Sequence, residues 1–145
     1  MNKFFSKSSK KTNNDISDSS KFEGNNKLGQ FFLRLSLKDR ILFIKQLAIL
    51  MRAGVPLFSS LNMLKKQTRS ATMLKIMTQV IKDVENGQYL ATALGKFKKV
   101  FGELTINIIA VGEISGSLSD NLDHLVLTLK KQQALKRKVV SASVY

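Results

Sequence analysis

From residue 36 onward, apolar side chains recur at spacings of three and four, the period of an amphipathic helix. The first helix is predicted to begin after Ser36, whose hydroxyl can cap it, with Asp39 in the first turn. Gly54 is expected to end this helix because glycine readily adopts left-handed backbone geometry. Pro56 then opens the next helix at its first turn.

The same pattern predicts five helices after the first, and few residues favour strands. The expected fold class is therefore all-α, a compact six-helix bundle. The stretch 104–111 is apolar on most sides, which predicts a helix at the centre of the bundle and not on its surface. Residues 96–99 are expected to be a basic link. The later helices are placed at about 57–67, 71–86, 89–94, 104–115 and 118–145.

Residues 112–118 interrupt this apolar pattern with two glycines, a carboxylate and two hydroxyls. Glu113 falls in the last turn of a helix, where the helix dipole disfavours a negative charge by about 0.3 kcal/mol or more. It therefore needs a partner, and a salt bridge or hydrogen bonds from a neighbouring helix end are the default. The alternative is a divalent cation, with Asp120 and Asp123 as further oxygen ligands and waters or a second subunit completing the cage.

The sequence contains no recognisable combination of residues that would support catalysis. The absence of cysteine excludes disulfides and thiolate metal sites. The single histidine, His124, stands beside Asp123, but adjacent helical residues point about 100° apart and do not form an acid–base pair. No phosphate-binding glycine loop is expected, because no strand is predicted to precede one. We therefore predict that the chain is not an enzyme and needs no cofactor, the cation near Glu113 being the one exception considered.

The net charge of +14 includes an excess at the end of the chain. Such a cluster can bind nucleic acid, attract anionic lipid or mark the cytoplasmic flank of a membrane helix. There is no recognition helix or aromatic stacking platform for nucleic acid. Residues 139–145 become apolar again, which favours the start of a segment leading into a membrane helix absent from this chain. The basic residues are Lys130, Lys131, Lys136, Arg137 and Lys138.

Three segments follow from these patterns. Residues 1–35 are rich in Ser, Asn and Lys and are predicted to be a disordered tail. Residues 36–138 are the predicted folded domain, and residues 139–145 lead toward the membrane. No secretory leader and no run of about 20 apolar residues is visible, so the chain is expected to be soluble as it stands.

A series of short motifs from residue 36 to the end resembles the first cytoplasmic domain of the type II secretion F and type IV pilus inner-membrane platform proteins. The motifs occupy residues 43–48, 53–57, 87–94, 101 and 112–118. Ala91 and Gly102 depart from the family's frequent serine and proline, which leaves open whether the branch is secretion, pilus or competence. The motif residues carried over are Gln46, Gly54, Pro56, Gly87, Gly112, Glu113, Gly116 and Leu118.

This resemblance implies a six-helix cytoplasmic bundle in a longer inner-membrane protein. The implied role is a platform for assembling pilin or pseudopilin subunits, coupled to a cytoplasmic ATPase and other inner-membrane components. A homo-oligomer and membrane attachment through the missing C-terminal part are expected, without nucleic acid as a partner. The alternative function is a basic helical module that binds nucleic acid or an anionic membrane.

Overall fold

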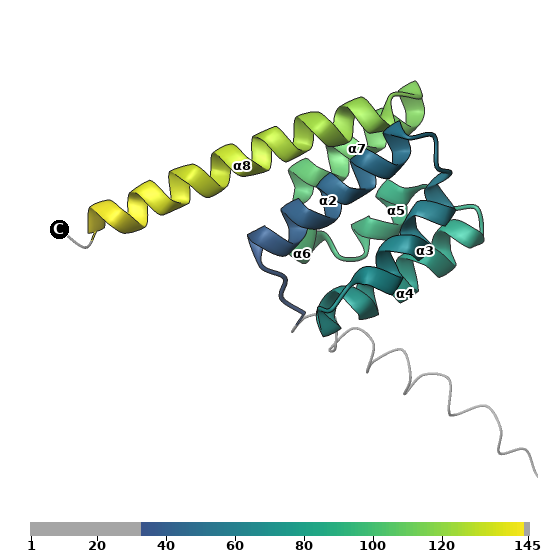
Figure 1. The fold of residues 1–145 in the computed structure, drawn as a ribbon, viewed down its shortest axis with the longest axis horizontal. Coiled ribbons are helices and arrows are strands. Elements are labelled where there is room, and N and C mark those ends of the chain that lie inside the picture. The colour runs from purple at the N-terminus through teal and green to yellow at the C-terminus, as the bar shows by residue number, and fades with distance from the viewer. Residues whose placement is uncertain (1–32, 144–145) are drawn as a thin grey trace, which may run out of the picture. The chain divides into compact units, whose positions relative to one another are not determined.

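The computed structural model describes residues 33–143, which contain seven helices and no strand (Figure 1). The predicted all-α class is confirmed, and the count of six helices is wrong by one. The helices are α2 (Leu37–Arg52), α3 (Leu57–Gln67), α4 (Ala71–Glu85), α5 (Leu90–Gly95), α6 (Lys98–Phe101), α7 (Glu103–Ser115) and α8 (Leu118–Ser143).

The additional helix is α6, which lies where a basic link was expected. Phe97, Val100 and Phe101 are buried, and their spacing of three and four requires a helical turn to bring them to one side. The amide of Phe101 donates to the carbonyl of Phe97, and Gly102 ends the turn with a φ of +83°. Lys96, Lys98 and Lys99 give this segment the pattern of a basic link, because so short a helix offers only three apolar anchors.

Glycine corners join the longer helices. At Gly54, φ is +81°, and the amides of Gly54 and Val55 donate to the carbonyls of Met51 and Leu50. These are the two bonds of a Schellman motif, which satisfies carbonyls at a helix end. Gly87, with a φ of +86°, repeats the arrangement at the end of α4. Local sequence alone is sufficient to produce these corners.

One hydrophobic core connects the helices of residues 33–143. The long helix α8 packs against α2 and α7, while α3 and α4 pack against each other (Figure 1). Phe43 of α2 meets Phe101 of α6 with ring centroids 6.0 Å apart. Each of the seven helices contributes at least one of the largest fully buried side chains. These are Ile44, Leu47, Leu61, Ile76, Met77, Val80, Leu90, Leu94, Phe101, Ile109, Leu122 and Leu125.

The prediction that α7 is the central helix is wrong. Only Thr105, Ile109 and Gly112 of this helix are buried. On its other side Val111 is 60% exposed and Ile114 is 82% exposed. Helices α5, α6 and α8 contact α7, so one face remains uncovered within residues 33–143. An apolar sequence shows that a helix can be buried on all sides, but the number of neighbours decides whether it is.

The ends of the described region differ slightly from the predicted segments. Leu33 and Leu35, which were assigned to the tail, pack against the core. The predicted tail otherwise lies outside the described residues, as do residues 144–145 at the end of the last predicted helix. No helix within residues 33–143 is long and apolar enough to cross a membrane.

Candidate functional site

Glu113 binds the N-terminal end of α5. Its two carboxylate oxygens accept hydrogen bonds from consecutive backbone amides, Oε1 from Leu90 at 2.5 Å and Oε2 from Ala91 at 2.8 Å. The first amides of a helix have no partner inside the helix, and its N-terminal end is electropositive. A carboxylate there is stabilised twice, by hydrogen bonding and by the dipole. The favourable interaction with α5 therefore offsets the unfavourable position of the Glu113 charge in the last turn of α7.

The corner between α7 and α8 depends on two glycines. Gly116 has a φ of +72°, and the amides of Gly116 and Ser117 both donate to the carbonyl of Gly112. A Cβ atom on Gly112 would lie 3.0 Å from Leu118 Cα and 3.1 Å from Asn121 Cβ. The backbone of α7 thus touches α8 directly after the corner.

Three corners meet at one end of the described region, to the right in Figure 1. A hollow of about 400 Å³ lies between them. Met51 and Leu57 come from the corner that contains Gly54 and Pro56, and Tyr89 follows Gly87. The remaining lining comes from Gly112, Glu113, Gly116, Leu118 and Ser119. Four of the eight predicted motif residues, Gly112, Glu113, Gly116 and Leu118, therefore line this hollow, and Leu57 directly follows a fifth, Pro56.

Two of the three carboxylates of the predicted cation site, Glu113 and Asp123, have other partners. Asp123 forms an ion pair with Arg52 at the end of α2, and both oxygens of Glu113 are engaged by α5. Residues 33–143 contain no group of three His, Cys, Asp or Glu side chains placed to hold a metal ion. A cation near Glu113 stays a prediction.

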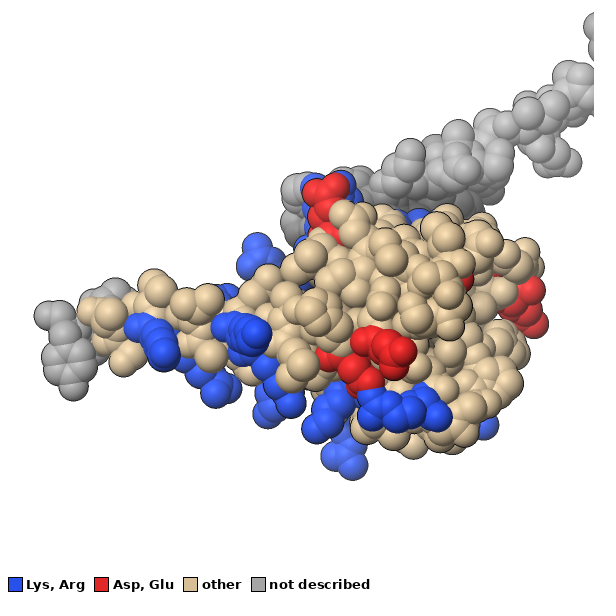
Figure 2. All heavy atoms as spheres, turned by 90° about the horizontal axis from the view of Figure 1, so that it is seen from above, with Lys and Arg blue, Asp and Glu red and all other residues tan. Residues whose placement is uncertain are grey.

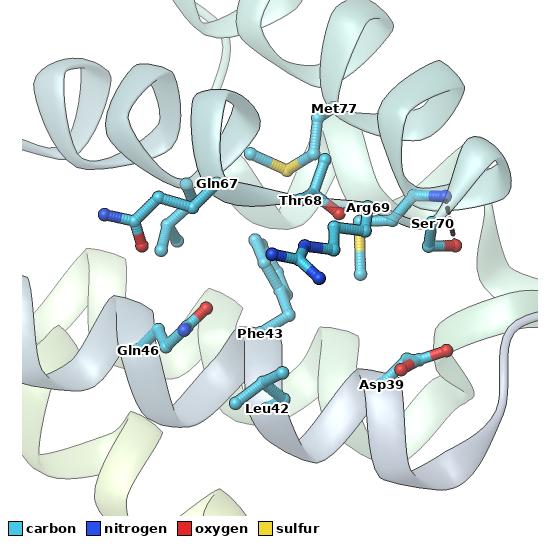
Figure 3. Close-up of a pocket in the computed structure, with 11 residues that line it drawn as sticks. Asp39, Leu42, Phe43, Gln46, Gln67, Thr68, Arg69, Ser70 and Met77 are labelled. Carbon is cyan, nitrogen blue, oxygen red and sulfur yellow. Dashed lines mark hydrogen bonds between the residues drawn. The ribbon is translucent and has the colours of Figure 1, made fainter.

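Gln46, another predicted motif residue, does not line this hollow. It lines a cavity of about 220 Å³ between α2 and the link from α3 to α4 (Figure 3). Phe43 and Met77 contribute apolar surface, while Gln67 faces Gln46 and Arg69 extends over the opening. Amide and guanidinium groups around an apolar base can bind a side chain or peptide, but they do not form a nucleophile with its base.

Sequence reasoning missed a buried carboxylate. Asp83 is 4% exposed and accepts hydrogen bonds from Lys96 Nζ at 2.7 Å and from Gln79 Nε2 at 3.1 Å. It joins α4 to the end of α5. Its position was detectable, because Asp83 follows Ile76 and Val80 by seven and three residues and thus belongs to the apolar face of α4.

A second missed residue is Arg40 on α2. Its guanidinium donates from Nη1 to the carbonyl of Phe101 at 3.3 Å, which connects α2 to the end of α6. Burial lowers the pKa of Arg40 because the charged form loses water. Nothing in the local sequence around Arg40 distinguishes it from the exposed Lys38 and Lys45.

The five basic residues near the end of the chain all lie on α8, beyond its last buried residue, Leu129. Residues 134–142 are all exposed, and this part of α8 projects from the other helices (Figure 1). Figure 2 shows its Lys and Arg side chains without an acidic side chain among them on the visible face. The sequence after Asp123 contains no Asp or Glu, so this positive charge is not neutralised locally.

Comparison with known proteins shows where this arrangement belongs. The family model described as "Type II secretion system (T2SS), protein F" matches residues 43–145. The type IV pilus assembly protein PilC of Thermus thermophilus is 39% identical over 109 residues, which cover 75% of this chain and 27% of that protein. The type II secretion system protein F of Xanthomonas campestris pv. campestris is 34% identical over 103 residues, covering 71% of this chain and 25% of that protein.

A third relative, the type II secretion system protein F of Vibrio cholerae, is 31% identical over 111 residues. The chain spans about a quarter of the length of these relatives. The comparisons do not support the alternative that it is a separate nucleic-acid-binding or membrane-binding module. From the matched motifs, the helical fold and the extent of the family match, the chain belongs to the type II secretion system protein F family.

Proposed function

We propose that this chain is a cytoplasmic domain of an inner-membrane platform protein that supports assembly of a type IV pilus or a secretion pseudopilus. The observation that carries the proposal is the match to the protein F family over residues 43–145. The relatives' names refer to type IV pilus assembly and to the type II secretion system.

The exposed half of α8 supports attachment to the membrane. Cationic residues concentrate on the cytoplasmic flank of membrane helices, and α8 places five of them beyond the helical core. In this proposal a membrane-spanning segment follows residue 145 in the longer protein. The next stretch of the gene tests this directly, since a polar continuation would contradict it.

Partner binding is proposed at two kinds of surface. The uncovered apolar face of α7 is suited to a second copy of the domain. Leu104, Val111 and Ile114 are exposed on it, and removing them from water favours association. A cytoplasmic assembly ATPase and other inner-membrane components are the remaining partners, with pilin or pseudopilin contacting the full-length protein. The domain itself is proposed to perform no chemistry and to need no cofactor.

Capture of the ATPase tests this function. The immobilised 145-residue chain is expected to retain the purified assembly ATPase encoded with it. The control is the same chain unfolded in urea, which keeps the charge of +14 and loses the folded surfaces. Equal retention by both forms, or no retention by the folded form, would contradict the proposal.

A calcium or magnesium titration tests the one remaining cofactor prediction. A cation at Glu113 would compete with the amides of Leu90 and Ala91 for the carboxylate oxygens. A rise in Tm that is lost in Glu113→Gln would establish the cation. An unchanged Tm would exclude it for the isolated domain.

A further inference from the structure

A second hollow lies where the distal part of α8 passes the beginning of α2. Its volume is about 470 Å³, and it is open to solvent along one side. Leu37 lies in it from the first turn of α2, and five residues of α8 complete it. These are Gln133, Lys136, Arg137, Val140 and Ser141.

The five α8 residues form one continuous helical face. Relative to Gln133, the others follow at three, four, seven and eight residues, the spacing of a single side of a helix. Two cations and two uncharged hydrogen-bonding groups therefore point to the same side. Leu37 and Val140 add apolar surface to the same hollow.

The charges around this hollow are all of one sign on α8. Lys138 continues the cationic surface into a neighbouring depression, where Arg137, Ser141 and Ala142 are also found. The last acidic residue before it is Asp123, which is already paired with Arg52. The hollow thus combines two cations with apolar surface from Leu37 and Val140. Its complement is an anionic group attached to an apolar chain.

We propose that this hollow binds the headgroup of an anionic phospholipid at the membrane surface. The phosphate accepts hydrogen bonds from the planar guanidinium of Arg137 and from the ammonium of Lys136. Gln133 and Ser141 donate to the remaining headgroup oxygens. The first part of an acyl chain lies against Leu37 and Val140. The inference rests on the proposed function only for the presence of a bilayer near this part of α8.

A nucleic acid fits the same charges less well. It offers phosphates but no flexible apolar chain for the surface between Leu37 and Val140. Single-stranded nucleic acids stack on aromatic side chains, and no aromatic side chain of residues 33–143 lines the hollow. Retention of duplex DNA is therefore an outcome that the experiment must separate from lipid binding.

The test is co-sedimentation of the 145-residue chain with phospholipid vesicles. Vesicles that contain phosphatidylglycerol should carry the chain down, and vesicles of phosphatidylcholine alone should not. The double variant Lys136→Gln, Arg137→Gln should bind phosphatidylglycerol vesicles roughly 30-fold more weakly, at about a factor of five for each cation. Val140→Ser should weaken binding while leaving the charge unchanged.

The matched control is Lys65→Gln, Lys66→Gln at the end of α3, which removes the same charge from two adjacent helical positions elsewhere. This control should lose about twofold or less, because only the diffuse attraction of the net charge is reduced. Equal losses in both double variants would overturn the site and leave general electrostatic attraction. Circular dichroism verifies that each variant keeps its helices.

Three further results would overturn the proposal. The first is an absence of binding to phosphatidylglycerol vesicles, and the second is full binding by Val140→Ser. The third is retention of duplex DNA that falls by the same factor in Lys136→Gln, Arg137→Gln, which would make the hollow a general polyanion site. None of these results affects ATPase capture, so failure of the lipid site and failure of the proposed function are distinguishable.

Discussion

At the scale of single residues, Glu113 shows how a position that is unfavourable locally becomes favourable in the folded domain. Within α7 its charge opposes the helix dipole. Its oxygens lie against amides 22 and 23 residues earlier in the chain, at the N-terminal end of α5. The corner is therefore a structural connection between α7, α5 and α8.

Replacing Glu113 with alanine is expected to destabilise the domain by about 2 to 3 kcal/mol, because two buried amides lose a charged acceptor. Urea denaturation at neutral pH measures the change. Glu113→Gln keeps one oxygen acceptor and should lose less. The control is Glu103→Ala, which removes an exposed pair with Lys98 and should cost about 0.5 kcal/mol. Equal losses for Glu113→Ala and Glu103→Ala would contradict this role.

Gly112 and Gly95 offer a second residue-scale comparison. A Cβ at Gly112 would meet the α8 backbone at 3.0 Å, whereas one at Gly95 would meet nothing within 4 Å. Gly112→Ala should therefore destabilise the domain by about 1 to 3 kcal/mol through overpacking. Gly95→Ala should be neutral or stabilising by up to about 1 kcal/mol. Thermal melting of both variants measures the difference, and similar Tm values would show that α7 and α8 can separate at no cost.

At the scale of helices, α8 has two different halves. Its first half packs against α2 and α7, and its last buried residue is Leu129. From residue 130 to Ser143 it continues for about 20 Å at the rise of an α-helix. No glycine or proline interrupts α8, so a displacement of the core can reach its far end.

Two glycines inserted between Gln132 and Gln133 are expected to abolish filament assembly by the full-length protein while the domain stays folded. Each glycine weakens the helix by about 1 kcal/mol relative to alanine. Insertion of two alanines is the matched control, because it moves and rotates the distal segment equally but keeps the helix stiff. Filament counts by electron microscopy measure the outcome. Normal assembly with the glycines, or equal loss with the alanines, would contradict transmission through a stiff helix.

At the scale of the whole domain, the uncovered face of α7 is an exposed apolar surface that association could bury. Leu104, Val111 and Ile114 recur along it at spacings of seven and three. Buried apolar surface contributes about 25 cal/mol for each Å² removed from water. A second copy of the domain is the proposed occupant.

Sedimentation velocity should show a weak, concentration-dependent dimer of the isolated chain. Val111→Asn with Ile114→Asn should make the chain monomeric. The control is Met63→Asn with Leu74→Asn, which removes two exposed apolar side chains of α3 and α4 and should leave association unchanged. A wild-type chain that is monomeric at high concentration would contradict the use of α7. An equal loss of the dimer in both double variants would contradict it as well.

Much of the fold follows from short-range pattern. Ser36 accepts a hydrogen bond from the amide of Asp39, so this cap lies where the sequence predicts it. Ser70 likewise accepts one from the amide of Met73, at the predicted start of the third helix. Gly54 and Gly87 have positive φ at the predicted helix ends. These features depend on a few adjacent residues, so the local sequence is sufficient to determine them.

The sequence by itself determined the all-α class, most helix ends, the family and the need of Glu113 for a partner. Only the tertiary structure decided that this partner is α5, that Asp83 is buried beside Lys96, and that α7 lies at the surface. The physical reason is distance along the chain. Caps and corners depend on neighbours within five residues, whereas burial and hydrogen-bond partners depend on which helices pack together.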